Sequence, residues 1–383
     1  MLPVLLGMAA AGLTVGSIYL AKTQLQNAVD AAALAGAQWA ATNPSSSPAS
    51  QAALITQNDP HSTGGTVAAE SNQPSMIRAT AYAEVPAGFA GLFGISEFTV
   101  GATAVAYHGP GQAFDWAIFQ GSSSQTLYFY AGGNTVNGGV HSNQNIVFDR
   151  EGQVVTGTLS ATGTLTPDPP ESSSVSNSIG SWAAGTPYIP MPTWPMPTLF
   201  NSTNAQVIDG NYTIPGGTTI NGNLLVNGTL TVDGDVTVNG SLQTDQGSIT
   251  FAGGGDVITG SLYADGGSIS LSGGDQVYGQ AVAEGGSVTF SGGGDTIGSS
   301  AHPLTVAAFP VDGVGGNVSF PGGNTFTGVV FAPGGTITVA KGGNNFTGAV
   351  VANNQVWDGG SNTVTWDQPY VDALPNQEVQ LVQ

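Results

Sequence analysis

The hydrophobic pattern of the chain begins with an unbroken apolar run. No charged side chain occurs before Lys22, and an Ala-rich stretch continues from there to Trp39. About 20 apolar residues in a helix, rising ~1.5 Å each, are long enough to cross the hydrocarbon of a bilayer. Alanine favours helix, and Pro44 disfavours helical geometry in the residue before it. The pattern predicts one helix over residues 1–42, apolar in its first half and able to lie in water after Lys22.

A second pattern, with a period of six residues, starts at Asn221. Each hexad opens with Asn-Gly or Asp-Gly, which accept the positive φ angles of tight turns. Two apolar residues then follow at alternate positions, as in Leu224 and Val226. Alternation indicates a strand with one buried face, and such frequent turns leave no room for useful hairpins. The hexads predict a parallel β-solenoid with three short faces per coil.

Beyond residue 246 the repeat lengthens to about 19 or 20 residues, and its copies align at Gly255, Gly274, Gly323 and Gly343. An earlier copy begins at Gly133. Glycines fall where the backbone turns, and branched or aromatic residues fall inside, where coils stack on one another. We expect a mainly β protein with a long N-terminal helix, a small β-rich collar and a right-handed parallel β-solenoid of about eight coils over residues 205–366.

These patterns divide the chain into four parts. The expected parts are the helix at 1–42, the collar at 43–110, the solenoid at 111–370 and a C-terminal tail at 371–383 that docks on a neighbour.

Residues 166–201 interrupt the solenoid pattern with eight prolines. Such a segment favours an extended excursion with polyproline character. Its aromatic residues either pin it to the rod or dock a partner, and pinning is the favoured interpretation. These residues are Trp182, Tyr188 and Trp194.

Composition limits the partners. Lys and Arg together number 4, and the net charge is −20. Nucleic acid is excluded as a partner because phosphate binding needs cationic side chains, and anionic lipid head groups are disfavoured for the same reason. The chain has no cysteine, so it has neither disulfides nor thiolate metal sites. Its polarity comes mainly from uncharged side chains, which suits an extracellular protein.

The N-terminal segment resembles the TadG-like proteins of the tight-adherence pilus system, which are related to type IV pilins. The resemblance covers about the first 107 residues. It rests on residues 2–6, 19–28 and 30–37, and on a second motif between residues 85 and 106. Leu5 stands where pilins carry a glutamate. The resemblance implies a helix that assembles into a pilus-like filament. The hexads resemble bactofilin-like β-helices, and the sequence around His141 resembles PilX-like surface proteins, which implies a fold but no site.

Small residues in the helix favour assembly over a plain membrane anchor. Gly12 and Gly16 form a small-xxx-small pattern that lets helices approach closely. A single membrane anchor remains the alternative. The residues expected to pack in a filament core are Leu2, Leu5, Leu6, Gly7, Gly12, Gly16, Tyr19, Leu20 and Leu25.

Three aspartates recur at one position of the long coils and invite a calcium ladder. They are Asp256, Asp275 and Asp295. In other coils this position holds Asn134, Asn324 or Asn344, and an amide is the weaker cation ligand. A turn role is therefore favoured, no cofactor is expected, and calcium is the alternative.

An enzyme is an alternative, because parallel β-helices also host polysaccharide-cleaving enzymes. Asp233 and Asp235 lie two apart, as paired carboxylates for glycoside cleavage require, but the repeat already explains Asp233 as a turn residue. A lyase base would have to be Arg150 or Lys341, and the histidines occur singly. The sequence predicts no enzyme.

The function predicted from the sequence is that of a structural subunit of an extracellular pilus-like filament. Its partners are copies of itself, a membrane that holds it by a single pass before assembly, and a glycan or cell surface. The first alternative is a monomeric membrane-anchored adhesin or minor pilin-like protein. An anchored carbohydrate-active enzyme is the second.

Overall fold

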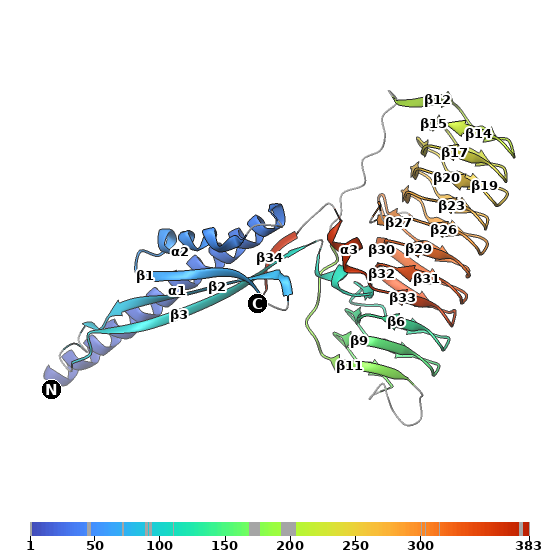
Figure 1. Cartoon of the computed structure of the whole chain (residues 1–383). Coiled ribbons are helices and arrows are strands. Elements are labelled where there is room, and N and C mark those ends of the chain that lie inside the picture. The colour runs from blue at the N-terminus through green and yellow to red at the C-terminus, as the bar shows by residue number, and fades with distance from the viewer. Residues whose placement is uncertain are drawn as a thin grey trace. The chain divides into compact units, whose positions relative to one another are not determined.

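The computed structural model describes the chain except for residues 1, 44–46, 71–72, 89–90, 92–93, 110, 168–176, 193–203, 300, 303, 314, 375–377 and 383. The side chains of residues 2–11, 42, 73–75, 378 and 380 are also outside the description. The chain is mainly β, with 47% strand and 16% helix, and contains a parallel solenoid, so the predicted fold class is confirmed. It forms two compact units (Figure 1). The first is Met1–Pro110 with Asn376–Gln383, and the second is Gly111–Pro375.

The first unit consists of a long helix on an antiparallel sheet. Helix α1 (Leu2–Thr42) ends beside Asn43, as the following proline predicts. The sheet has the order β1-β2-β3-β34. Its strands are β1 (Ser62–Glu70), β2 (Gln73–Pro86), β3 (Glu97–Gly109) and β34 (Glu378–Val382). Two short helices, η1 (Pro48–Ala52) and α2 (Ala53–Asn58), connect α1 to β1.

Small side chains bring α1 close to this sheet. The buried residues of α1 include Ala28 and Ala32, and β2 contributes a row that includes Ala79 and Ala81. A Cβ added at Gly36 would lie 2.6 Å from Cγ1 of Val67 and 2.9 Å from Cγ2 of Ile77. The helix can therefore take its place only because this residue has no side chain.

The end of the chain completes the same sheet. Strand β34 pairs with β3 in antiparallel register, from Val105 opposite Val382 to Gly109 opposite Glu378. The expected tail at 371–383 therefore contributes a strand to its own unit, and α3 (Gln368–Asp372) precedes it. The second unit is thus an insertion between two neighbouring strands of the first. Docking of the tail on a neighbour stays a prediction.

The second unit is a parallel β-solenoid of about 12 turns. Equivalent residues stack from turn to turn, as Leu224, Leu242 and Leu262 do. Its first segment contains β4 (Ile118–Gln120), β5 (Leu127–Phe129), β6 (Thr135–Asn137), β7 (Val140–Ser142), β8 (Ile146–Phe148), β9 (Val154–Ala161), β10 (Leu165–Thr166) and β11 (Ser178–Ala184), preceded by η3 (Gln112–Asp115).

The second segment of the solenoid supplies the remaining strands. They are β12 (Ala205–Asp209), β13 (Tyr212–Ile214), β14 (Thr219–Asn221), β15 (Asn223–Asn227), β16 (Leu230–Val232), β17 (Thr237–Asn239), β18 (Leu242–Thr244), β19 (Ile249–Phe251), β20 (Val257–Ile258), β21 (Leu262–Asp265), β22 (Ile269–Leu271), β23 (Gln276–Val277), β24 (Ala281–Glu284), β25 (Val288–Phe290), β26 (Thr296–Ile297), β27 (Leu304–Phe309), β28 (Val318–Phe320), β29 (Thr325–Thr327), β30 (Val329–Val339), β31 (Asn345–Thr347), β32 (Val350–Trp357) and β33 (Thr363–Thr365).

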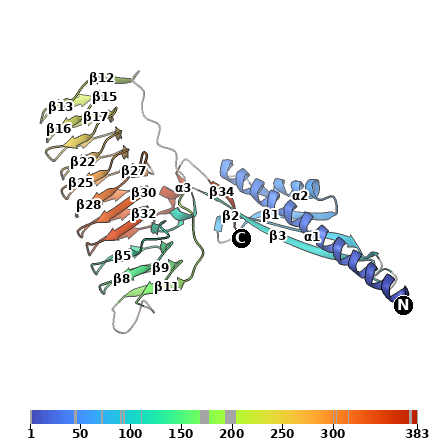
Figure 2. The same ribbon diagram turned by 180° about the vertical axis from the view of Figure 1, so that it is seen from behind.

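The coils do not stack in sequence order. Val350 of β32 pairs with Ile118 of β4, and Thr363 of β33 pairs with Thr135 of β6, so the last coil lies against the first. Strands β11 and β12 lie at opposite ends of the stack (Figure 2). A solenoid wound from end to end would enter and leave about 55 Å apart at ~4.8 Å per coil. This order brings entry and exit into neighbouring coils, as insertion between β3 and β34 requires.

Aromatic rings fill the core near the junction of the two segments. The rings of Phe326 and Phe346 stack with centroids 5.0 Å apart, and those of Phe129 and Trp357 stack at 5.7 Å. Because Trp357 and Phe129 belong to the second and first segments, this stack continues the core across the junction. The join between the segments is therefore packed like the rest of the rod.

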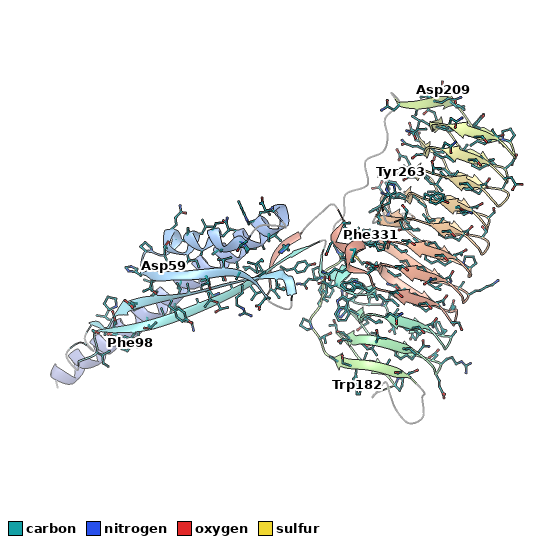
Figure 3. The ribbon with its side chains drawn as sticks, in the orientation of Figure 1. Asp59, Phe98, Trp182, Asp209, Tyr263 and Phe331 are labelled. Carbon is teal, nitrogen blue, oxygen red and sulfur yellow. The ribbon has the colours of Figure 1, made fainter. Side chains whose placement is uncertain are left out.

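One outward-facing row of the solenoid is apolar and covered by the chain itself. Tyr263, Val282, Phe331 and Phe119 occupy equivalent outward positions and are buried, with α3 and η3 contributing to the same cluster. Tyr263 and Phe331 are labelled in Figure 3. This row explains why the segments outside the coils pack on this face.

Part of the expected excursion at 166–201 is a solenoid strand. Strand β11 pairs with β9, and its Ile179 is buried in the continuous core. The sequence does not predict this strand, because its apolar alternation is short and the segment around it is rich in proline. Residues 168–176 and 193–203, including Trp194, lie outside the described part of the chain.

Candidate assembly surface and buried polar networks

Helix α1 changes character where it leaves the sheet. From Ala21 onward one of its faces is buried. Before that, Leu13 is 77%, Val15 66%, Tyr19 74% and Leu20 59% exposed. Several large apolar side chains exposed along one short stretch of helix indicate an interaction site. These four side chains define the candidate assembly surface.

The exposed apolar residues point in different directions. At ~100° per residue, Leu13 and Leu20 lie on one side of α1, whereas Val15 and Tyr19 lie on the other. A helix that is apolar on all sides is normally surrounded, either by protein or by lipid. The surface therefore suits several neighbours better than a single partner.

Two of the predicted assembly glycines are open to contact. A Cβ added at Gly12 or Gly16 would meet no atom within 4 Å. Both leave the helix backbone accessible, as close helix packing requires. Leu25 is fully buried in the core of its own unit, so it cannot belong to a surface between subunits.

The first residues of α1 belong to the predicted assembly surface. The side chains of Leu2, Leu5, Leu6 and Gly7 lie outside the description, and their assembly role stays a prediction. Among the residues that the structure describes, no helix is both long enough and apolar enough to span a bilayer.

The three candidate calcium ligands lie at one buried corner of successive coils. In each, Oδ1 accepts a backbone N–H from the preceding coil: Val236 donates to Asp256 at 2.7 Å, Asp256 to Asp275 at 3.1 Å, and Asp275 to Asp295 at 3.0 Å. The same bond continues through the amides. Its further acceptors are Asn324, Asn344, Asn362 and Asn134.

The amide and acid members of this corner differ in their second polar atom. Nδ2 of Asn344 donates to the carbonyl oxygen of Lys341 at 3.1 Å, and Nδ2 of Asn362 to that of Gly359 at 2.9 Å. Oδ2 of Asp256 and of Asp295 is buried without a hydrogen-bond partner among the described residues. The acidic coils therefore lack one hydrogen bond that the amide coils make.

Burial also shifts the pKa of these acids. Burial, offset in part by the backbone bond from Val236, raises the pKa of Asp256 to about 7. Burial likewise raises the pKa of Asp295 to about 6. It also raises the pKa of Asp275. A protonated carboxyl has an O–H donor where asparagine has an N–H donor. The acid form of these residues can thus donate as the amides do.

No group of three or more His, Asp or Glu residues in the described part of the chain is arranged to hold a metal ion. Calcium binding at Asp256, Asp275 and Asp295 stays a prediction. A strong rise in melting temperature on adding calcium is the observation that supports it.

From the sequence, His141 is predicted to be an isolated histidine. The strand order, however, places two polar partners beside it. Its Nδ1 lies 3.0 Å from Oγ of Ser160 on the next coil, and its Nε2 lies 3.1 Å from Oδ1 of Asn143. Oγ of Ser160 is 2.9 Å from Oγ1 of Thr186. Asn143 also bonds both backbone groups of Ile189, at 2.9 and 2.6 Å.

This network holds residues 185–192, the strap, against the coils. Ser160, His141 and Asn143 follow the order of a hydrolase triad. All three are buried, however, and burial lowers the pKa of His141. Ser160 and Asn143 already have strap partners, Thr186 and Ile189. We therefore interpret the three residues as the strap latch.

The strap is pinned by residues other than those that the sequence indicates. Trp182 is 42% and Tyr188 54% exposed, whereas Ile189 and Met191 pack against the buried outward row. Trp182 and Tyr188 therefore do not act as the staples expected of them, and Trp194 lies outside the described part of the chain.

Comparisons with known proteins bear on α1. Residues 1–39 match the Tad family, described as putative Flp pilus-assembly TadE/G-like. The N-terminal helix is thus similar to that of pilus-assembly proteins, which supports the coarser part of the predicted resemblance. The likeness of the solenoid to bactofilin-like and PilX-like proteins stays a prediction.

A solved structure similar to the chain is the competence-associated pilin ComZ from Thermus thermophilus. The identity is 12%, the TM-score is 0.30, and the match covers 83% of this chain and 84% of that chain. A TM-score this low carries no argument about function. Comparison with curated proteins gives no match.

Proposed function

We propose that the chain is a structural subunit of an extracellular pilus-like filament. The apolar halves of its α1 helices pack together in the filament core, and the solenoids are displayed outside. The observation that carries the proposal is the exposure of Leu13, Val15, Tyr19 and Leu20 on a helix whose other half is fixed to its own sheet. The family match over residues 1–39 supports it.

The energetics favour association of these helices. Burying a large apolar side chain stabilises by about 1.5–3 kcal/mol, and four such residues are exposed per subunit. The open sites at Gly12 and Gly16 allow the close packing that must replace contacts with lipid or water. A helix apolar on both sides gains most when neighbours surround it.

Electron microscopy of material sheared from cells tests the proposal. Fibres of one repeating subunit are expected. An added Cβ at Gly12 or Gly16 meets no atom of the isolated subunit within 4 Å, and the double substitution Gly12→Leu and Gly16→Leu is expected to abolish fibres. The double substitution Thr213→Leu and Thr219→Leu is the control, because it adds the same two side chains at exposed strand positions of the solenoid. Detergent-dependent monomers, with surface display intact in the double variant, would instead support a membrane-anchored surface protein.

The exposed faces of the solenoid favour adhesion to an uncharged target. Strands β14, β17, β29, β31 and β33 read TIN, TVN, TFT, NFT and TVT, with no charged residue. In a chain of net charge −20, a neutral array of hydroxyls and amides suits neutral glycans. Retention of fibres on a panel of neutral polysaccharides tests this, and turnover of the same panel tests the enzyme alternative.

A further inference from the structure

A polar pocket of about 420 Å³ lies in the first unit, on the side of α1 that carries α2. Its walls come from α1 and from the turn between α2 and β1, where Asp59 is labelled in Figure 3. The lining residues of α1 are Gln24, Asn27, Ala28 and Ala31. The turn contributes Asn58, Asp59, Pro60 and His61.

Asp59 gives this pocket an unfilled hydrogen-bonding role. The residue is 2% exposed, and its Oδ1 accepts the backbone N–H of His61 at 3.0 Å. Its Oδ2 is buried without a hydrogen-bond partner among the described residues. A buried carboxyl oxygen without a partner is costly, and a cation is the partner that compensates it best. The pocket therefore favours a positively charged group.

The chain itself offers few cations. Arg78 is paired with Glu70, and Arg150 and Lys341 belong to the solenoid unit. Lys22 is the remaining side chain among the lysines and arginines, lies exposed on α1, and forms no salt bridge within the described part of the chain. Its long alkyl stem and compact ammonium suit a pocket that ends in a carboxylate.

Lys22 and the pocket lie on opposite sides of the same helix. At 3.6 residues per turn, the stripe formed by Gln24, Asn27, Ala28 and Ala31 is about 170° around α1 from Lys22. The two groups therefore cannot meet within one subunit. Complementary groups on opposite sides of one element produce a head-to-tail contact instead of a two-fold dimer, and such a contact builds an open helical filament when its rotation does not close into a ring.

We propose that the pocket receives the Lys22 side chain of a neighbouring copy, and that the Asp59 side chain turns on binding so that its buried Oδ2 accepts a hydrogen bond from the ammonium. The stem lies along Ala28 and Ala31, and the amide oxygens of Gln24 and Asn27 accept the remaining ammonium protons. This inference rests on the proposed filament, because it needs a second copy beside the first.

Zero-length carbodiimide coupling tests the contact in native fibres. Lys22 and Lys341 are the only lysines, so a new isopeptide bond is easily assigned by mass spectrometry. Fibres grown from a mixture of isotopically light and heavy subunits are expected to give a Lys22–Asp59 link that joins light to heavy chains. Links from Lys22 to other carboxylates only, or none, would overturn the proposal.

Variants supply the second measurement. Asp59→Asn keeps the bond from His61, and Lys22→Gln changes an exposed residue, so both leave the subunit folded. Each is expected to raise the critical concentration for assembly about tenfold or more, as loss of a desolvated charge pair does. Lys341→Gln removes the same charge from the solenoid and should assemble normally.

The outcomes separate this inference from the proposed function. Absence of fibres in the native protein overturns both. Fibres that assemble normally with Lys22→Gln overturn the inference alone. Fibres that dissolve in a chelator and are restored by calcium, with Lys22→Gln unaffected, would assign the pocket to a divalent cation instead.

Discussion

The backbone N–H of Asp256 donates a hydrogen bond to Oδ1 of Asp275, 3.1 Å away in the neighbouring coil, and both residues are buried. The same bond continues along one corner of the solenoid through Asp295 and then through asparagines. One corner is thus acidic at one end and amide at the other, with the same backbone geometry throughout.

The acidic end predicts that the solenoid is more stable in acid. The pKa of Asp256 is about 7 and that of Asp295 about 6 in the folded chain, against ~4 for an unperturbed aspartate. The folded state holds these protons more tightly, so stability is greatest below about pH 4 and is lost as the pH rises through about 6 to 7. The neighbouring carboxylate of Asp235 acts in the same direction. Calorimetric melting temperatures across this range check it, and a flat profile would contradict it.

Substitution by asparagine should affect the three acids differently. Asp256→Asn and Asp295→Asn supply a donor where Oδ2 has no partner, so each should raise the free energy of unfolding at neutral pH by about 1–2 kcal/mol. Oδ2 of Asp275 already accepts the N–H of Ser272 at 3.2 Å. In Asp275→Asn the new Nδ2 donor would face the N–H of Ser272, which is also a donor. No gain in the free energy of unfolding is therefore expected.

The reverse change provides the control. Asn344→Asp removes the donor to the carbonyl oxygen of Lys341 and should destabilise the solenoid at neutral pH but much less in acid. Denaturant melts at both pH values measure the four variants together. Equal gains for Asp256, Asp275 and Asp295 would show that general charge reduction, and not the individual hydrogen bonds, sets stability.

Substitution of glycine by alanine should change stability in opposite directions in the two halves of α1. Gly36→Ala forces a methyl group against Val67 and Ile77 and should destabilise the first unit by about 1–3 kcal/mol. Gly12→Ala meets open space and should favour the helix by up to ~1 kcal/mol. Unfolding of unassembled subunits, followed by circular dichroism, compares them. Similar effects at both sites would contradict the division of α1 into a packed and an open half.

The strap latch should weaken in acid while the acidic corner strengthens. Because the pKa of His141 is lowered, the folded state resists protonation, and the latch's contribution is lost as the pH falls from about 6.5. Protonation turns the acceptor nitrogen facing Ser160 into a donor. Hydrogen exchange at the amide of Ile189, which Asn143 holds, should therefore speed up relative to core amides. Asn143→Ala should produce the same exposure at neutral pH, and unchanged exchange would contradict the latch.

The sequence predicts the regular parts of this molecule because they are local. The proline after Asn43 is enough to end α1, and Asn-Gly turns with alternating apolar residues are enough to predict coils. The stacking order is not local. Coils share one pattern, so nothing in the repeat tells that Val350 lies beside Ile118 and not beside a residue of a further coil.

The candidate sites divide in the same way. The exposed apolar half of α1 is visible as an uncharged run before Lys22. Leu25, which the sequence assigns to the same assembly surface, is buried, because only the sheet decides which part of the helix is covered. Asp59 carries no sequence signal, since a lone aspartate after a short helix looks like any turn residue. Ser160 and His141 meet only because β7 and β9 are neighbours.

Removal of the solenoid provides the last prediction, because Gly109 and Glu378 face each other across the end of two paired strands. A two-residue Asn-Gly turn joins antiparallel strands of this kind, so it can replace residues 110–377. The first unit keeps its own hydrophobic core, which α1, β2 and β3 build without any solenoid residue. We expect a folded protein that still assembles through α1 into thinner fibres that no longer bind the native target. Circular dichroism tests whether the shortened protein folds, and electron microscopy tests whether it forms thinner fibres. A folded but unassembled product would show that the solenoids hold the filament together, and would move the assembly surface from α1 to the rod.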